Sequence, residues 1–184
     1  RALSHNDLLE HVRLSSNLVT MGEDAFLNDG KLSSIVIPGS LKDICSDTFL
    51  NCHSLETVTI EEGVEHIGHR AFGACGMTQL QLPSTISSIG SYAFTGCSSL
   101  ESINLPDGIE TIEEYTFNAC ESLKRIEIPD SVRKIETRAF AGCESLDHLV
   151  LPQSVEEFST EAFLDTPEMC LVVLNPDCLY SIYR

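Results

Sequence analysis

Basic residues are scarce in this chain, and their scarcity excludes two classes of partner. The 184 residues include 11 Lys and Arg against 28 Asp and Glu, which gives a formal net charge of −17. Binding to nucleic acid requires clustered cations that displace counterions from the phosphates, and the sequence has no such cluster. The same imbalance disfavours an anionic membrane surface. We therefore predict no nucleic-acid partner.

Long apolar runs and catalytic motifs are also missing. No segment approaches the 18 consecutive apolar residues that indicate a membrane-spanning helix, so we predict no direct membrane insertion. The sequence has no G-x-S-x-G and no glycine-rich phosphate loop, and among its six histidines only His66 and His69 lie close together. An active site needs a nucleophile, a base and an orienting group that converge. We predict that the protein is not an enzyme and has no cofactor.

Metal-binding patterns are equally scarce. No two cysteines have the C-x-x-C spacing of a zinc site, and we predict no metal. Three acidic pairs, which begin at Glu61, Glu113 and Glu156, allow either a solvated face or weak calcium binding. No loop shows the alternating Asp and Asn ligands of a dedicated calcium site. The solvated face is therefore the preferred interpretation.

What the chain does contain is a phenylalanine that recurs at a fixed period. The steps between successive copies are 22 or 23 residues, at Phe26, Phe49, Phe72, Phe94, Phe117, Phe140 and Phe163. A period in this range is typical of stacked structural units, each of which buries its apolar face against its neighbours. The sequence therefore predicts a solenoid in place of a globular domain with one central core.

One repeat changes its hydrophobic period along its length. Ile103-x-Leu105 alternates with period two, as in a short strand with one buried face, and Pro106 ends the ladder because it has no N–H. The step from Ile109 to Ile112 begins the return path and allows a second, very short strand. The segment around Phe117 resembles one helical turn. The predicted strands are centred on Val12, Ile35, Val58, Leu80, Ile103, Ile126, Leu149 and Val172.

Five of the eight cysteines occupy one slot, three residues after a phenylalanine. Stacking predicts an interior column in which a free Cys acts as a small hydrophobe, formed by Cys52, Cys75, Cys97, Cys120 and Cys143. The other three are Cys45, Cys170 and Cys178. The sequence allows a disulfide between Cys170 and Cys178 but does not require one. Unpaired thiols are typical of a reducing cytosol, and they are also tolerated outside an anaerobic cell.

The unit Leu-x-x-Ile-x-Leu-Pro-x-x-Ile-x-x-Ile-x-x-x-Ala-Phe-x-x-Cys resembles the BspA-type leucine-rich repeat, also called the treponemal type. This resemblance covers the chain from about Leu9 to Leu174. It implies an α/β solenoid, a right-handed leucine-rich-repeat superhelix with a parallel β-sheet on one face and short turns of helix or 3-10 helix on the other. It also implies an extracellular or cell-surface location, a role in adhesion or recognition, and no shared catalytic residues.

The whole chain, 1–184, is predicted to be a single repeat domain of about eight coils. The repeat pattern stops at Asn175. Residues 175–184, with Pro176, Tyr180 and Tyr183, are predicted to form a C-terminal cap, because the ends of repeat stacks need covering. Truncation of a longer array is the alternative.

The outward side chains of the predicted sheet are the candidate binding site. Successive side chains of a strand alternate between the core and the outer surface. The candidate residues on the sheet face are Thr57, Thr59, Gln79, Gln81, Ser102, Asn104, Arg125 and Glu127. Ordinary strand-surface residues without a partner would look the same, since Thr in particular suits strands. The functional interpretation is a face that binds a protein or a glycan.

A second surface lies at the C-terminal edge, where Val150, Leu171 and Val173 are apolar and predicted to point outward. An exposed apolar patch of this kind favours association. The sequence thus leaves two functions open. The first is a non-catalytic binding module at a bacterial cell surface. The second is a structural spacer or a module that self-associates through this edge. For the location, the cytoplasm is the lesser alternative to the cell surface.

Overall fold

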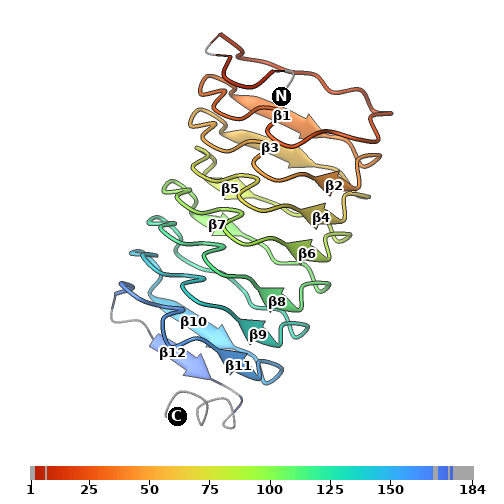
Figure 1. Cartoon of the computed structure of the whole chain (residues 1–184). Helices are drawn as coiled ribbons and strands as arrows, with labels where there is room; N and C mark the ends of the chain where they lie inside the picture. Colours follow the sequence, from red (N-terminus) through yellow and green to blue (C-terminus); the bar gives the residue numbers. More distant parts are fainter. Residues whose placement is uncertain (1–2, 7, 168–169, 174, 176–184) are drawn as a thin grey trace.

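The chain forms a stack of parallel β-coils in the computed structural model, which describes residues 3–6, 8–167, 170–173 and 175, the last strand by its main chain only. Two rows of short strands run down the stack (Figure 1). The main row contains β1 (Ser34–Ile37), β3 (Thr57–Ile60), β5 (Gln79–Leu80), β7 (Ser102–Ile103), β10 (His148–Leu151) and β12 (Cys170–Val173). The second row contains β2 (Asp43–Ile44), β4 (His66–Ile67), β6 (Ser88–Ile89), β8 (Thr111–Ile112), β9 (Lys134–Ile135) and β11 (Glu157–Phe158).

All strand pairs are parallel, and each joins one coil to the next. In the main row, β1 pairs with β3, β5 with β7 and β10 with β12, while single bridges join His11 to Ser34 and Ser102 to Arg125. The second row forms two sheets, β2-β4-β6 and β8-β9-β11. The second, very short strand that the sequence allowed between Ile109 and Ile112 is present as β8. The predicted parallel solenoid is confirmed.

The phenylalanines form the centre of the stack. Their rings lie nearly parallel, with centroids 5.2 to 5.7 Å apart and interplanar angles of 2° to 13° from Phe26 to Phe163. Five of them, from Phe49 to Phe140, are 0% exposed. Each ring from Phe49 to Phe140 stacks on a phenylalanine of the coil before and of the coil after, so the core is a continuous column to which each coil adds one layer.

The prediction of helical turns around the phenylalanines was wrong, because the described residues contain turns there and no helix. Tyr115 and Ala119, two residues on either side of Phe117, have φ of 56° and 55°. A right-handed helix needs negative φ at every residue. Because the backbone alternates in this way, the N–H groups of all three residues point along the stack. They donate to carbonyls of the next coil over 3.0, 2.8 and 2.7 Å.

The cysteine column is interior, and each thiol has a hydrogen-bonding role that the sequence did not reveal. Each Sγ donates to the carbonyl of the phenylalanine one coil earlier, as Cys120 does to Phe94 over 3.2 Å. The same contact recurs at Cys52, Cys75, Cys97 and Cys143 over 3.0 to 3.2 Å. These five cysteines are free thiols and buried. The possible bridge between Cys170 and Cys178 lies outside the described side chains, as does most of the predicted cap.

We expect the protein to lose stability at alkaline pH because of this column. Burial raises the pKa of Cys52, Cys97 and Cys143 to about 12, whereas a Cys in the unfolded chain titrates near pH 8.5. Below about pH 8.5 the thiols stay protonated in both the folded and the unfolded state, and the pH has no effect on stability through them. Between about pH 8.5 and 12 only the thiols of the unfolded chain ionise, so the free energy of unfolding falls. Urea unfolding measured from pH 7 to 11 checks this, and Cys97→Val should show a shallower decline. Identical pH profiles for the two proteins would contradict the assignment.

Candidate functional site

The predicted binding residues lie on the outward side of the main row, and most of them are exposed. Along β3 the side chains of Thr57 and Thr59 are exposed, while Ile60, the last residue of the strand, is buried. Gln79, Gln81, Arg125 and Glu127 are also exposed, and Ser102 and Asn104 are half-buried. The alternation of each strand therefore presents these eight side chains on one face of the stack.

Seven of these eight side chains make no hydrogen bond or ion pair within the described part of the chain. They are Thr57, Thr59, Gln79, Gln81, Ser102, Arg125 and Glu127. Their donors and acceptors face solvent, where a ligand could replace water. The face combines neutral polar groups with one cation and one carboxylate.

Asn104 differs from the other seven because its amide is already used by the fold. Its Oδ1 accepts from the N–H of Leu82 over 2.7 Å, and its Nδ2 donates to the carbonyl of Leu82 over 3.0 Å. The strand pairing of β5 with β7 ends at Leu80 and Ile103. The side chain therefore extends the hydrogen bonding between the two coils to Leu82, two residues beyond the last paired residue of β5.

We expect Asn104→Ala to lower the free energy of unfolding by about 1–3 kcal/mol, because it leaves the N–H and C=O of Leu82 without their partner. Gln79→Ala, on the neighbouring strand, removes an exposed side chain with no partner and should change stability by less than about 0.5 kcal/mol. Urea denaturation of both variants and the parent checks the difference. Equal midpoints for the two variants would contradict a structural role for Asn104.

A shallow hollow of about 270 Å³ lies within this face. Five of the predicted residues, Gln81, Ser102, Asn104, Arg125 and Glu127, line it, together with the edges of buried aliphatic side chains. Thr57, Thr59 and Gln79 lie outside its lining. The structure thus brings five of the eight predicted residues together around one hollow.

A second hollow, of about 450 Å³, adjoins the first across the segment from Arg125 to Glu127. Its other lining residues include Asp130, His148 and Val150. The strand alternation predicts that His148 and Val150 point outward, but nothing in their spacing indicates a hollow between two coils. Asp130 directly follows Pro129, which ends this strand segment, and sequence reasoning missed it.

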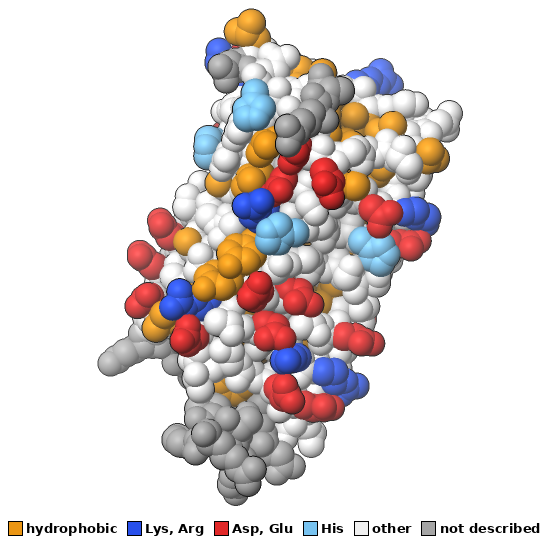
Figure 2. Space-filling view, viewed as in Figure 1, with side chains coloured by type: hydrophobic (Ala, Val, Ile, Leu, Met, Phe, Trp, Pro, Cys, Tyr) orange, Lys and Arg blue, Asp and Glu red, His pale blue; other side chains and the backbone are white. Residues whose placement is uncertain are grey.

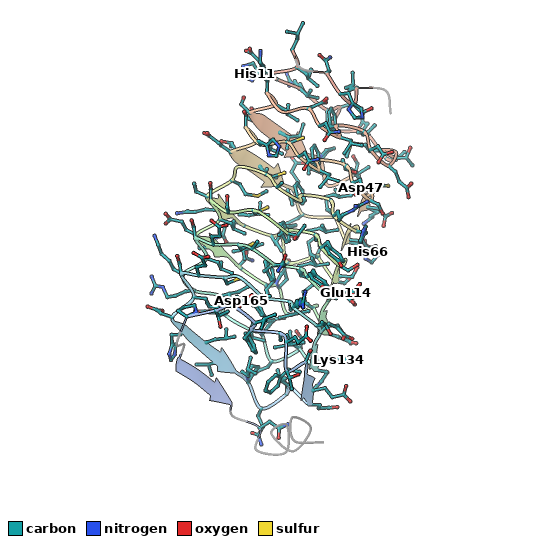
Figure 3. All side chains as sticks on the ribbon, turned by 60° about the vertical axis from the view of Figure 1, so that its left-hand side comes forward. His11, Asp47, His66, Glu114, Lys134 and Asp165 are labelled. Atoms are coloured by element: carbon teal, nitrogen blue, oxygen red, sulfur yellow. The ribbon has the colours of Figure 1, made fainter. Side chains whose placement is uncertain are left out.

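The second row has a different surface, on which four of the six outward polar side chains, His66, Ser88, Lys134 and Glu157, pair with one another. His66 Nδ1 lies 2.9 Å from Ser88 Oγ on the next coil. Lys134 Nζ lies 2.9 Å from a carboxylate oxygen of Glu136 and 3.6 Å from one of Glu157. In Figure 3, His66 and Lys134 lie along the same side of the stack as Asp47 and Glu114. The contacts of His66 with Ser88 and of Lys134 with Glu157 join successive coils and stabilise the frame. They leave fewer free groups than the main row offers.

Acidic side chains occur in several groups over the surface, with Lys and Arg dispersed among them (Figure 2). Within the described residues there is no group of three or more His, Cys, Asp or Glu that could hold a metal ion. No helix in that part of the chain is long and apolar enough to cross a bilayer.

The repeat itself identifies the family. The family model for the BspA-type leucine-rich repeat region, with six copies, matches residues 1–80 and 65–178. The chain belongs to the BspA-type leucine-rich repeat family. No curated protein matches the chain at a significant level.

Solved leucine-rich repeat proteins share the fold of this BspA-type chain. A protein from Bacteroides ovatus is 22% identical with a TM-score of 0.58, and the match covers 88% of this chain and 57% of that one. The T. pallidum leucine-rich repeat protein is 31% identical with a TM-score of 0.52, over 77% and 58% of the two chains. A protein from Eubacterium ventriosum is 23% identical with a TM-score of 0.57, over 76% and 44%. The chain thus spans about half the length of these proteins.

Proposed function

We propose that this BspA-type repeat chain is a non-catalytic recognition module that binds a partner protein or glycan through the outward side chains of the main row. The observation that carries the proposal is the contrast between the two rows. Seven of the predicted main-row side chains have no partner within the described chain, whereas the second row pairs His66 with Ser88 and Lys134 with Glu157. Side chains that are already paired within the fold contribute less binding free energy, because their internal bonds must first be broken.

The geometry of the face supports multipoint contact. Repeat stacks present a broad and regular surface. Here Thr57, Thr59 and Gln79 lie on two consecutive coils beside the hollow that Gln81, Arg125 and Glu127 line. We expect the affinity to be distributed over several coils. Any single substitution then removes only part of the binding free energy.

A binding screen of the purified chain tests the proposal. The chain is screened against host matrix proteins and a glycan array at physiological salt, beside the double variant Gln79→Ala/Gln81→Ala. We expect a ligand whose binding the double variant weakens about tenfold or more, which corresponds to about 1.4 kcal/mol. The chain should be a monomer by light scattering. No ligand, or a dimer that Val150→Asp dissociates, would contradict recognition and favour a spacer or self-associating module.

We also propose an extracellular or cell-surface location, as membership of the family and its usual role imply. Antibody raised against the purified chain should then label intact source cells, or detect the protein in their medium. Labelling only after lysis would contradict the location. The five buried thiols are compatible with either place, because their burial limits access to oxidants.

A further inference from the structure

The main row is interrupted between the segment that follows Arg125 and strand β10. In a parallel ladder, alternate residues direct their N–H and C=O to the same neighbouring strand. In β3 the N–H of the outward Thr57 donates to the carbonyl of Ser33 on the preceding coil over 3.2 Å. His148 and Val150 occupy the equivalent outward positions of β10, so their N–H and C=O groups face the preceding coil. Within the described residues, no main-chain hydrogen bond joins residues 124–128 to residues 147–151. The edge of β10 and the segment from 124 to 128 are thus unpaired here.

The hollow of about 450 Å³ lies over this interruption. Its floor is apolar and includes Ile126, Ile128 and Val150, of which Val150 is 38% exposed. Arg125, Glu127, Asp130 and His148 complete its polar rim. The other sides of the same two coils stay joined, since β9 pairs with β11 and the N–H of Phe140 donates to Ala162. The opening is therefore confined to the main-row face.

The charge of the rim favours a cationic ligand. Glu127 and Asp130 are exposed and make no ion pair within the described chain, and Arg125 is the one Lys or Arg in the lining. The chain as a whole carries a net charge of −17. A ligand with Lys or Arg would therefore be attracted to the molecule at long range and would find two free carboxylates at the hollow.

We propose that this hollow binds an extended, basic peptide segment of a partner protein. The segment adds main-chain hydrogen bonds to the unpaired groups of His148 and Val150, as in other cases of β-augmentation. One aliphatic side chain of the peptide lies on the floor formed by Ile126, Ile128 and Val150, and a Lys or Arg contacts Glu127 and Asp130. This inference rests on the proposed recognition function and assigns it a ligand class and a position.

Panning a phage-displayed library of random dodecapeptides on the full chain tests this inference. We expect enrichment of peptides that combine Lys or Arg with an aliphatic residue. Synthetic versions are then titrated by fluorescence anisotropy against the parent and two matched variants. Val150→Asp should weaken binding at least tenfold, whereas Val36→Asp, at the equivalent outward position of β1 and 51% exposed, should leave it unchanged. Methylation of the peptide's main-chain nitrogens should abolish binding.

A second pair of variants keeps the test valid if Val150→Asp disturbs folding. Glu127→Lys/Asp130→Lys should weaken the same peptides at least tenfold, and Glu156→Lys, an exposed acid away from the hollow, should not. No enrichment, or peptides insensitive to both hollow variants, would overturn the inference. A glycan or protein ligand that needs Gln79 and Gln81 but not Val150 would overturn it while leaving the proposed function intact.

Discussion

Replacing Phe94 by Ala should lower the free energy of unfolding by about 3–5 kcal/mol, the usual cost of removing a buried aromatic side chain. Phe94 is 0% exposed, and its ring stacks between Phe72 and Phe117 at centroid distances of 5.7 and 5.6 Å. The substitution removes a layer from the middle of the column and leaves a cavity on both sides. Because coils contact only their nearest neighbours, the two halves of the stack should also become less strongly coupled.

Urea denaturation followed by circular dichroism measures the loss, and hydrogen exchange shows where the chain opens. Phe163→Ala is the matched control, because Phe163 is half-buried and stacks on Phe140 at the C-terminal end of the column. Phe163→Ala should lower the free energy of unfolding by less than half as much as Phe94→Ala. A similar loss for both variants, or an unchanged exchange pattern in Phe94→Ala, would contradict a stack held together by this column.

Gly63→Ala should lower the free energy of unfolding nearly as much as the loss of a central phenylalanine, because of the backbone geometry at Gly63. Gly63 has φ of 111°, and a Cβ there would lie 2.4 Å from the carbonyl oxygen of Gly39. Strained backbone alone costs about 1–3 kcal/mol, and the contact with main-chain atoms forces the two coils apart as well. We expect a total loss of about 3 kcal/mol or more, in the range of other severe core substitutions.

The same urea experiment checks this result, with Gly22→Ala as the control. A Cβ on Gly22 would meet no atom within 4 Å, and its φ lies outside the left-handed region. This control should therefore be neutral or slightly stabilising, since Ala reduces the entropy of the unfolded chain. A neutral result for Gly63→Ala would contradict the close approach of these coils. Glu61 belongs to the same contact, because its Oε2 accepts from the N–H of Gly39 over 3.1 Å.

The sequence was sufficient to predict the solenoid, since burial repeats with the same period as the residues. Phe94, Ile103 and Ile112 occupy fixed slots, and the structure buries all three. The turns around each phenylalanine were missed, because a helical turn was predicted there. Tyr115 and Arg138 have positive φ, although such angles are normally adopted by Gly or Asn. The hydrogen bonds to the next coil accompany this geometry. Asn28, Asn51, Gly96 and Gly142 occupy the same slot as Ala119 and do favour positive φ, but the sequence analysis did not use that signal.

The candidate site was predicted less completely than the fold. Strand alternation identified the exposed Gln79 and Gln81, yet it grouped Asn104 with them although that side chain serves the main chain of Leu82. The hollow beside β10 depends on where main-chain pairing stops between two coils. Side-chain patterns in one repeat carry no information about that, so Asp130 was missed.

The most direct test of recognition through the main row is the dissociation constant of an identified ligand for variants of the two faces. Gln79→Ala/Gln81→Ala alters the main row, and Ser88→Ala/Thr111→Ala alters outward residues of the second row by the same number of truncations. The account predicts at least about tenfold weaker binding for the first variant, or about 1.4 kcal/mol, and an unchanged constant for the second. Equal constants for the two variants, or a larger loss in the second, would contradict it.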